Sequence, residues 1–328
     1  MNPVVITGAG GFVGASLYKY LGSYLGKHTE IIAIERPGGT VWRLKDIAPL
    51  KTAKVDLTSI NEVASFIREV KPSIIINCAA YGAYPNQTDV DKIYSTNFDG
   101  VRNLLEASKN ISGFRAFIQC GSSSEYGLNC SGPAENSYTQ PDSHYAVSKV
   151  SATSLVQYYG KSLSFPAWVL RLYSLYGPLE ETSRLIPTLL LHAKEKKLPP
   201  LVNPQISRDF LFIDDLCGAI GAVISKSDNL ERGEIFNIGS GKKTTLSDIV
   251  DLTRDLFHIT EKPQWGSMEN RNWDRKEWFA NPEKAKSVLG WHPSVSLRDG
   301  LMKTMDWINK NPETLLSSLK NSVLGKPV

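Results

Sequence analysis

A glycine-rich segment directly after the first apolar run constrains this chain more than any other feature. Residues 7–14 read TGAGGFVG and precede an amphipathic helical pattern. Gly8 permits a tight turn, Gly11 lets the backbone approach a pyrophosphate, and Gly14 lets the helix pack closely against the strand. A helix that begins here also presents unpaired N–H groups and the positive end of its dipole to a phosphate. The segment, with Phe12 and Val13, therefore predicts a dinucleotide-binding turn.

Short apolar runs alternate with helical patterns through much of the chain. Runs rich in β-branched residues predict buried strands over residues 4–6, 30–34, 74–78, 116–120, 168–172 and 234–238. Helical patterns cover residues 14–25, 60–70, 90–110 and 145–162. Strands that alternate with helices form parallel sheets with right-handed crossovers and helices on both faces. We therefore predict an α/β fold of the Rossmann type, with a doubly wound parallel sheet.

The pattern changes after Tyr176, where prolines punctuate the chain and helical pieces alternate with loops. We expect a smaller C-terminal lobe that binds the substrate. On this prediction the dinucleotide-binding domain comprises residues 1–173 and about 206–239, and the substrate lobe comprises residues 174–205 and 240–322. Ligands of open α/β sheets bind beyond the carboxyl ends of the strands, so such a lobe would close over a substrate.

The composition excludes several classes of function. The net charge is +4 and the basic residues are scattered among acidic ones, so we expect no nucleic-acid partner. No apolar run approaches the roughly 20 residues that cross a bilayer, and the first residues show no secretory signal pattern. The four cysteines form no CxxC pair, so no metal site is predicted. We expect a cytoplasmic protein with no membrane partner.

The end of the second strand bears on the choice of cofactor. Glu35 would accept hydrogen bonds from the adenosine ribose of NAD, whereas Arg36, joined by Arg43, would pair with the 2′-phosphate of NADP. NAD(H) and NADP(H) therefore both stay open, with a slight preference for NADP(H). Asp56 and Leu57 follow at the end of the third strand, where the carboxylate either reaches the adenine amine or begins a helix.

Tyr145 and Lys149 stand four residues apart in the segment YAVSK, on one face of a predicted helix. An unperturbed tyrosine has a pKa of about 10 and is a poor base at neutral pH. A nearby ammonium, helped by a positive nicotinamide ring, favours the phenolate and lowers that pKa. The pair predicts a proton-transfer group, although a tyrosine and a lysine on a surface often share this spacing.

Two strand ends bring further residues to the same edge of the sheet. The run GSSSEYG at 121–127 places serine hydroxyls where one of them could hold a substrate oxygen while Tyr145 exchanges its proton. The segment NCAA at 77–80 ends another strand with Ala79 and Ala80, whose small side chains would let a nicotinamide ring lie close. A serine-rich turn without a catalytic role is the alternative.

Taken together, these motifs resemble those of the extended short-chain dehydrogenases/reductases that act on sugar nucleotides. The resemblance covers essentially the whole chain. It extends from TGAGGFVG, NCAA, Thr96-Asn97, SSSEYG and YAVSK to LRLYSLYGP at 170–178, RDFLFIDD at 208–215 and the pair NPEKA and LGW at 281–291.

The resemblance implies roles for the matching positions. Tyr145 would be the acid/base, Lys149 would orient the nicotinamide ribose, and Ser122 would hydrogen-bond the sugar O4. The remaining cofactor contacts that it implies are Asn97 and Tyr173, in addition to the residues named above.

A second set of positions would contact the substrate. Arg208 resembles the arginine that grips the nucleotide diphosphate, a task suited to a bidentate guanidinium. Ser174 stands where many relatives have asparagine, which puts its contact in doubt. The implied substrate-binding residues are Ser123, Ser124, Ser174, Arg208, Arg271, Trp273 and Arg275.

Three reactions recur in this family: 4-epimerisation, 4,6-dehydration and 4-keto reduction. Related dehydratases carry an acidic residue two positions before the tyrosine that matches Tyr126. Here Ser124 holds that place and Glu125 follows it, and a one-residue offset at a strand end turns the side chain away. Dehydration is therefore disfavoured.

Local segments favour reduction. GSSSEYG, ERPGGTVWRL and the LYGP to LPPLV region resemble CDP-paratose/abequose synthases and GDP-4-keto-6-deoxymannose reductases. We predict NAD(P)H-dependent reduction of an NDP-4-keto-6-deoxyhexose at C4, in the nucleotide-sugar metabolism that supplies cell-surface polysaccharides. The alternative is an NDP-sugar 4-epimerase with tightly bound NAD. A non-catalytic NAD(P)-binding redox sensor is the remote alternative, since such proteins often lose the tyrosine, the lysine or the serine.

The family also suggests an oligomeric state. Relatives commonly form homodimers through the helices that match residues 90–110 and 145–162. Val150 and Leu155 are apolar positions that permit this packing.

Overall fold

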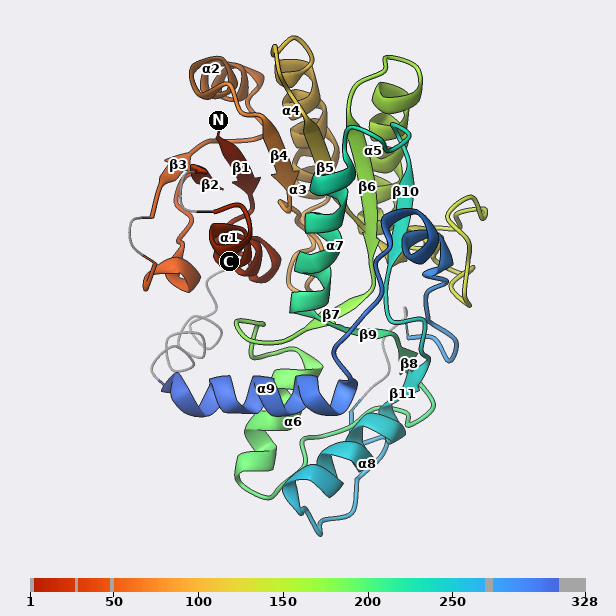
Figure 1. The fold of residues 1–328 in the computed structure, drawn as a ribbon. Helices are drawn as coiled ribbons and strands as arrows, with labels where there is room; N and C mark the ends of the chain where they lie inside the picture. The colour runs from red at the N-terminus through yellow and green to blue at the C-terminus, as the bar shows by residue number, and fades with distance from the viewer. Residues whose placement is uncertain (1–2, 27–28, 48–49, 269–273, 313–328) are drawn as a thin grey trace.

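The computed structural model describes residues 3–26, 29–47, 50–268 and 274–312. Its centre is a seven-stranded parallel sheet in the order β10-β6-β5-β4-β1-β2-β3 (Figure 1). The strands are β1 (Val4–Thr7), β2 (Ile31–Glu35), β3 (Thr52–Lys54), β4 (Ile74–Asn77), β5 (Ala116–Ser122), β6 (Ala167–Leu172) and β10 (Ile235–Ile238). From β1 the chain runs outward to β3, then returns to β4 and runs outward the other way. The topological switch point therefore lies between β1 and β4, and the predicted Rossmann-type fold is confirmed.

Helices cover both faces of this sheet. On one face, α1 (Phe12–Tyr24) and α7 (Ile213–Lys226) pack on residues such as Val4 and Ile6. On the other face, α2 (Ile60–Val70), α4 (Gly100–Ser108) and α5 (His144–Lys161) pack on Val5 and its neighbours. Successive side chains of a strand point to opposite faces, so a strand buried on both faces is apolar throughout. This is why the strands appear in the sequence as unbroken apolar runs.

The helix predicted over residues 90–110 contains a π-helical turn. It begins as α3 (Val90–Tyr94), widens over Ser95–Asp99 and continues as α4. Asn97, at the centre of the wide turn, is buried. π-Turns inside helices are frequent at functional sites, and this one aims Asn97 at the loop that follows β4.

The remaining elements lie beyond the carboxyl ends of the sheet strands (Figure 1). They comprise two short strand pairs, β7 (Ser174–Tyr176) with β9 (Phe210–Phe212) and β8 (Ser207–Arg208) with β11 (Thr244–Thr245), and the helices α6 (Leu185–Lys194), α8 (Leu246–Phe257) and α9 (Leu297–Lys310). Leu189, Ile249 and Leu301 on these helices belong to the same apolar core as α1 and α7. The division into a dinucleotide-binding domain and a substrate lobe stays a prediction.

Three single turns complete the described elements: Trp42–Leu44, Ser123–Tyr126 and Ala285–Leu289. Within the residues that the structure describes, no helix has both the length and the apolar character needed to cross a bilayer.

Candidate active site

The glycine-rich turn joins β1 to α1 at the switch point of the sheet. Gly8 has a φ of +63°, and a Cβ there would lie 2.7 Å from the nitrogen of Ala79. A Cβ on Gly14 would lie 2.5 Å from the carbonyl oxygen of Gly8, so the helix could not approach the turn as it does. Gly11 is the N-cap of α1, and among the described residues no side chain caps it. The first N–H groups of α1 are thus suited to an anion, which fits the pyrophosphate of a dinucleotide.

Arg43 anchors this turn rather than facing a cofactor phosphate. Its guanidinium donates to the carbonyl oxygens of Gly10 and Leu179, both at 2.9 Å, and pairs with Glu181 at 3.2 Å. The side chain is 6% exposed, because it lies between the turn and the segment after β7. The expectation that Arg43 joins Arg36 at a 2′-phosphate is therefore wrong: its donors are engaged by the protein.

A buried polar ladder fixes the strand ends around the turn. Thr7, Asn77 and Gln119 occupy paired positions on β1, β4 and β5. Thr7 donates to Asn77, whose Nδ2 donates to Gln119 Oε1 at 2.8 Å. Thr7 Oγ1 also accepts from the N–H of Ala79 at 3.3 Å. Because these buried groups satisfy one another, the chain leaves β4 in one defined direction, toward the glycine turn.

Tyr145, Lys149 and Ser122 meet where α5 begins and β5 ends. Lys149 is 2% exposed and donates from Nζ to the carbonyl oxygen of Cys120 at 2.5 Å. Tyr145 hydrogen-bonds to Ser122. The N-cap of α5 is Ser143, whose side chain accepts from the N–H of Ala146 and so fixes where the helix starts. The three predicted catalytic residues thus form one cluster.

The electrostatics of this cluster differ from the expectation. Burial raises the pKa of Tyr145 to about 12, while the hydrogen bond from Ser122 and the charge of Arg184 act to lower it. Burial also lowers the pKa of Lys149. For the protein without a cofactor, desolvation is therefore the largest effect on the pKa of Tyr145, and the expected lowering by Lys149 and a nicotinamide ring stays a prediction. At neutral pH Tyr145 is a phenol with a proton to donate.

The serine run is held by a buried carboxylate behind it. Ser122 Oγ lies 2.7 Å from Ser124 Oγ and accepts from the N–H of Ser124. Glu125 is fully buried; its Oε1 accepts from the N–H of Ser122 at 2.9 Å, and its Oε2 accepts from Arg171 Nε at 2.8 Å. Both oxygens of Glu125 are therefore engaged by the protein, and its charge also acts on Tyr145; that the side chain turns away from the tyrosine stays a prediction.

Arg208 and Trp278 lie next to the serine run. Trp278 Nε1 donates to Ser123 Oγ at 3.1 Å, and the Arg208 guanidinium lies over the Trp278 ring at 4.9 Å. Arg208 pairs with Asp274 at 2.7 Å. Its pKa is lowered, mainly by burial, and Arg184 lowers it further because its cation is close. Two guanidinium groups thus face one region beside the catalytic cluster.

Asn97 acts on the site through the backbone around it. Its side chain accepts from the N–H of Tyr81 at 2.9 Å and donates to the carbonyl of Tyr81 and to Ser148 Oγ. Ser148 in turn donates to the carbonyl of Tyr145. Asn97 therefore ties the loop after β4 to α5, and its direct contact with a cofactor stays a prediction.

The predicted adenosine-side residues lie at the ends of the outer strands. Glu35 ends β2 and is buried to 9% exposure, whereas Arg36 is exposed. Asp56 accepts from the N–H and the hydroxyl of Thr58 in the turn before α2, whose N-cap is Ser59, so its contact with an adenine stays a prediction. Leu57 is buried beside it. The alanines at positions 79 and 80 follow β4 beside Gly8.

The remaining predicted substrate and cofactor residues lie in different parts of the structure. Ser174 begins β7, and Arg275 pairs with Asp142 at 2.5 Å. Tyr173 is buried against Gly239 on the far side of β6 from the glycine turn, so its cofactor contact stays a prediction. Arg271 and Trp273 lie outside the described residues.

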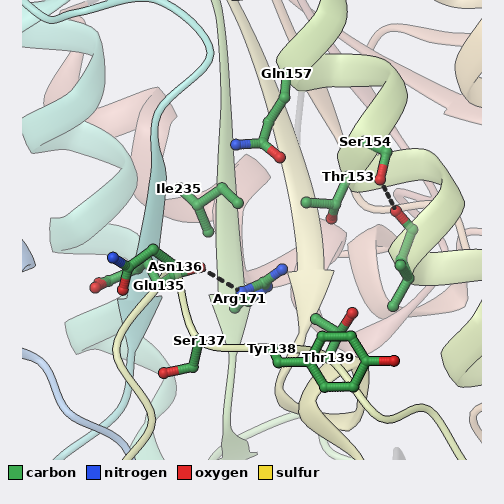
Figure 2. A pocket seen from close by; sticks show the side chains of 11 residues that line it. Glu135, Asn136, Ser137, Tyr138, Thr139, Thr153, Ser154, Gln157, Arg171 and Ile235 are labelled. Carbon is green, nitrogen blue, oxygen red and sulfur yellow. Dashed lines mark hydrogen bonds between the residues drawn. The ribbon is translucent and has the colours of Figure 1, made fainter.

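A cavity of about 260 Å³ lies apart from this cluster. Figure 2 shows it between α5, which contributes Thr153, Ser154 and Gln157, and the loop of Glu135 and its neighbours. Its lining includes none of the predicted catalytic or cofactor-binding residues. The cavity therefore lies between α5, β6, β10 and the loop at 135–139, and it is not the candidate active site.

The chain matches a family model described as the NAD dependent epimerase/dehydratase family over residues 4–239. The match covers the glycine turn, the serine run, Tyr145 and Lys149 in their order. The chain belongs to this family.

Known members of the epimerase/dehydratase family match nearly the whole chain. A trifunctional UDP-glucose 4,6-dehydratase/UDP-4-keto-6-deoxy-D-glucose 3,5-epimerase/UDP-4-keto-L-rhamnose-reductase of Arabidopsis thaliana is 28% identical over 94% of this chain. The chain spans only 47% of that protein, about half the length of the first relatives it matches. An uncharacterised UDP-glucose epimerase of Bacillus subtilis is 29% identical over 93% of this chain and 98% of its own length.

A solved structure supports the same family at the level of the fold. The dTDP-glucose 4,6-dehydratase of Bacillus anthracis, in complex with NAD, superposes with a TM-score of 0.82 at 26% identity. The comparison covers 95% of this chain and 98% of that one. Members of the family thus include dehydratases, epimerases and reductases of sugar nucleotides.

Sequence patterns did not single out several residues that shape the epimerase/dehydratase site. Arg184 precedes α6 and lies over the ring of Tyr84 at 5.7 Å. Glu180 has a side chain that is 6% exposed, and burial raises its pKa to about 8. Trp278 lies between Ser123 and Arg208. Each comes from a loop with no regular period, so only its charged or aromatic character could have drawn attention to it.

Proposed function

We propose that this protein reduces the 4-keto group of an NDP-4-keto-6-deoxyhexose with a nicotinamide dinucleotide. The observation that carries the proposal is the state of Tyr145. Tyr145 is half-buried and interacts with Ser122, and the pKa of its phenol is raised to about 12, so it carries its proton at neutral pH. Reduction of a ketone needs a proton donor at the carbonyl oxygen, whereas oxidation of an alcohol needs a base.

The residues around the glycine turn fit a dinucleotide. Gly8 and Gly14 leave room that a Cβ would fill, and the start of α1 supplies N–H groups for the pyrophosphate. Glu35 at the end of β2 suits the two ribose hydroxyls of NAD(H). Since Arg43 is engaged elsewhere, Arg36 alone would favour NADP(H). We therefore propose NAD(H), which reverses the slight preference drawn from the sequence.

The residues of the cluster divide the chemistry between them. When bound, the reduced nicotinamide would supply a hydride to C4. Ser122 donates a hydrogen bond to the C4 carbonyl oxygen and polarises it. Tyr145 then transfers its proton to the same oxygen, and the buried Lys149 stabilises the phenolate that remains. The hydride added to C4 and the proton added to O4 together convert the ketone into an alcohol.

The charges beside the cluster suit a sugar nucleotide. Arg184 and Arg208 are close enough for one cation to lower the pKa of the other. A diphosphate between the two guanidinium groups would relieve their repulsion, and its oxygens would replace the Asp274 carboxylate as the partner of Arg208. Ser123, held by Trp278, and Ser124 and Ser174 complete the proposed sugar contacts, with Arg275 on the nucleotide side.

Dehydration is the reaction that the cluster supports least. Elimination across C5 and C6 needs a carboxyl group at the sugar. Glu125, the nearest candidate in the serine run, is fully buried and held by Arg171 and the N–H of Ser122. It cannot reach a substrate without breaking a buried ion pair, which costs about 3–5 kcal/mol.

NDP-sugar 4-epimerisation is the second candidate. It uses the same Tyr145, Lys149 and Ser122, and the Bacillus subtilis relative of equal length carries the name of an epimerase. A redox sensor without catalysis is the third and weakest reading, because all three residues of the cluster are assembled. A homodimer through α4 and α5 would bury Val147 and Tyr158, which are 37% and 52% exposed.

One assay separates these readings. The purified protein is incubated with NADH or NADPH and a CDP-, GDP-, dTDP- or UDP-linked 4-keto-6-deoxyhexose. Reduction predicts one coenzyme oxidised per sugar reduced, with NADH preferred. Interconversion of two C4 epimers with no net coenzyme oxidation would replace reduction by epimerisation. Binding of coenzyme with no turnover of any sugar nucleotide would support the sensor.

A further inference from the structure

Two thiols meet between β4 and β5, one strand away from the switch point of the sheet. Cys78 follows the last residue of β4, Cys120 lies in β5, and their Sγ atoms are 3.6 Å apart. Asn77 and Gln119, the residues before them, are register partners on these two parallel strands. Adjacent strands lie about 4.8 Å apart, and a disulfide joins Cα atoms about 4.4–6.8 Å apart. The two sulfurs can therefore be bonded by side-chain rotation without moving the strands.

We propose that Cys78 and Cys120 are a redox-active pair whose disulfide, formed by a peroxide, switches off the neighbouring catalytic cluster. The pair is placed where small oxidants can reach it. Cys78 is half-buried, with its backbone against Gly8, and Cys120 is 7% exposed beside it.

The surroundings favour a thiolate on Cys120. Cys78 and Cys120 share a hydrogen bond in which either sulfur can be the donor, and this bond together with the Lys149 cation lowers the pKa of Cys120 against the effect of burial. The other two cysteines lack this environment. Burial raises the pKa of Cys130 and of Cys217, and Cys217 is only 1% exposed. Since the thiolate is the reactive form, oxidation is directed to the first pair.

The oxidation balances with one peroxide. The Cys120 thiolate attacks a peroxide oxygen, so that an S–O bond forms as the O–O bond breaks, and the first water leaves after protonation. Cys78 then loses its proton and attacks the Cys120 sulfur, forming the S–S bond and releasing the second water. Two thiols lose two electrons and two protons, and the peroxide gains them. A thiol reductant reverses the step.

The disulfide would act on both sides of the proposed reaction. The backbone of Cys78 lies within 2.8 Å of the position of a Cβ on Gly8, so it lines the glycine turn. The carbonyl of Cys120 holds Lys149 at 2.5 Å. Rotating both side chains into a bond crowds this region and disturbs the lysine. The link to activity rests on the proposed function, whereas the formation of the disulfide does not.

The test is oxidation of the full chain by hydrogen peroxide. The expected result is a mass loss of about 2 Da, a fall from four free thiols to two, and one cross-linked peptide pair containing residues 78 and 120. Activity should fall in proportion to the cross-linked fraction and return with dithiothreitol. Added NAD⁺ should slow the cross-linking.

Matched variants separate the possible outcomes. Cys78→Ser should resist inactivation relative to its own untreated activity, whereas Cys130→Ala should respond as the unchanged protein does. If the cross-link forms but NAD⁺ does not slow it and turnover does not fall, the disulfide exists without acting as a switch. That result would contradict the proposed regulation and count against the proposed active site. Mass gains of oxygen atoms without a cross-link, or a bond that involves Cys217, would overturn the proposal.

Discussion

The Lys149 ammonium donates a hydrogen bond to the carbonyl oxygen of Cys120 at 2.5 Å and so connects the second turn of α5 to the end of β5. The bond fixes the lysine beside Tyr145 before any cofactor arrives. It also satisfies a cation that is 2% exposed, which would otherwise be costly to bury. The geometry of the proton-transfer group is thus built into the sheet edge itself.

Replacing Lys149 should separate catalysis from folding. In Lys149→Met the alkyl chain keeps its packing, while the cation that stabilises the phenolate is lost. We expect kcat to fall about 100-fold or more, the weaker end of general acid–base effects. Thermal unfolding should change by only a few degrees, because a buried charge and its partner are both expensive. Lys161→Met, on the same helix with a side chain 49% exposed, should change neither.

Loss of Arg43 should loosen the glycine turn. Arg43→Ala removes hydrogen bonds to Gly10 and Leu179 and leaves Glu181 without its cation. We expect a loss of about 3–5 kcal/mol in unfolding free energy, measured by urea denaturation, and weaker coenzyme binding. Arg36→Ala, at an exposed position, should leave stability unchanged. If Arg36→Ala leaves the binding of NADH and NADPH unchanged, or weakens both equally, the preference for NADH gains support. A selective loss of tight NADPH binding would contradict it.

Glu180 should make stability depend on pH. Burial raises the pKa of this carboxyl to about 8, above its ordinary value of 4.5. A raised pKa means that the folded state favours the neutral form, so the stabilisation is complete below the ordinary pKa and is lost as pH rises toward 8. Glu180→Gln keeps a neutral side chain at every pH. Its melting temperature should match the unchanged protein at about pH 4, below the ordinary pKa, and exceed it by several degrees at pH 8, at roughly 1.4 kcal/mol per pKa unit.

The matched control for this experiment is Glu195→Gln, whose side chain is 70% exposed. The difference between this variant and the unchanged protein should not vary with pH. A constant difference for Glu180→Gln as well would mean that Glu180 is ionised in the folded protein.

Arg208 should govern substrate binding more than turnover. Arg208→Lys keeps a charge but loses the fork that can bind two phosphate oxygens. We expect KM for the sugar nucleotide to rise about tenfold, the equivalent of 1.4 kcal/mol, with a smaller change in kcat. Arg298→Lys, at an exposed ion pair, is the control. A fall in kcat alone would place Arg208 at the reacting sugar instead of at the diphosphate.

The sequence was sufficient for the sheet and for the catalytic cluster. The apolar runs marked six of the seven sheet strands, since strands buried on both faces must be apolar, and GxxGxxG and YAVSK marked the turn and the helix face. β3 has exposed alternate residues and only three positions, so it carried no such signal.

Contacts between distant loops were beyond reach from the sequence. Arg43 donates to the carbonyl oxygen of Leu179, 136 positions away in the sequence, and the residues next to Arg43 in the sequence do not indicate a buried partner. The pKa of Tyr145 was expected to fall because its lysine neighbour is visible in the sequence, whereas the burial that raises it is a property of the fold. The direction of Glu125 was also beyond this reasoning, because residues 123–126 form a 3₁₀ turn and the alternation of side chains along a strand does not apply there.

The most direct measurement follows a deuteride from C4-deuterated NADH into the sugar, with Tyr145→Phe as the comparison. The protein should place deuterium on C4 of an NDP-4-keto-6-deoxyhexose, and the variant should still bind NADH while its rate falls about 100- to 10,000-fold. A product with no deuterium at C4, or a variant with an unchanged rate, would contradict the role of Tyr145 as proton donor in a C4 reduction.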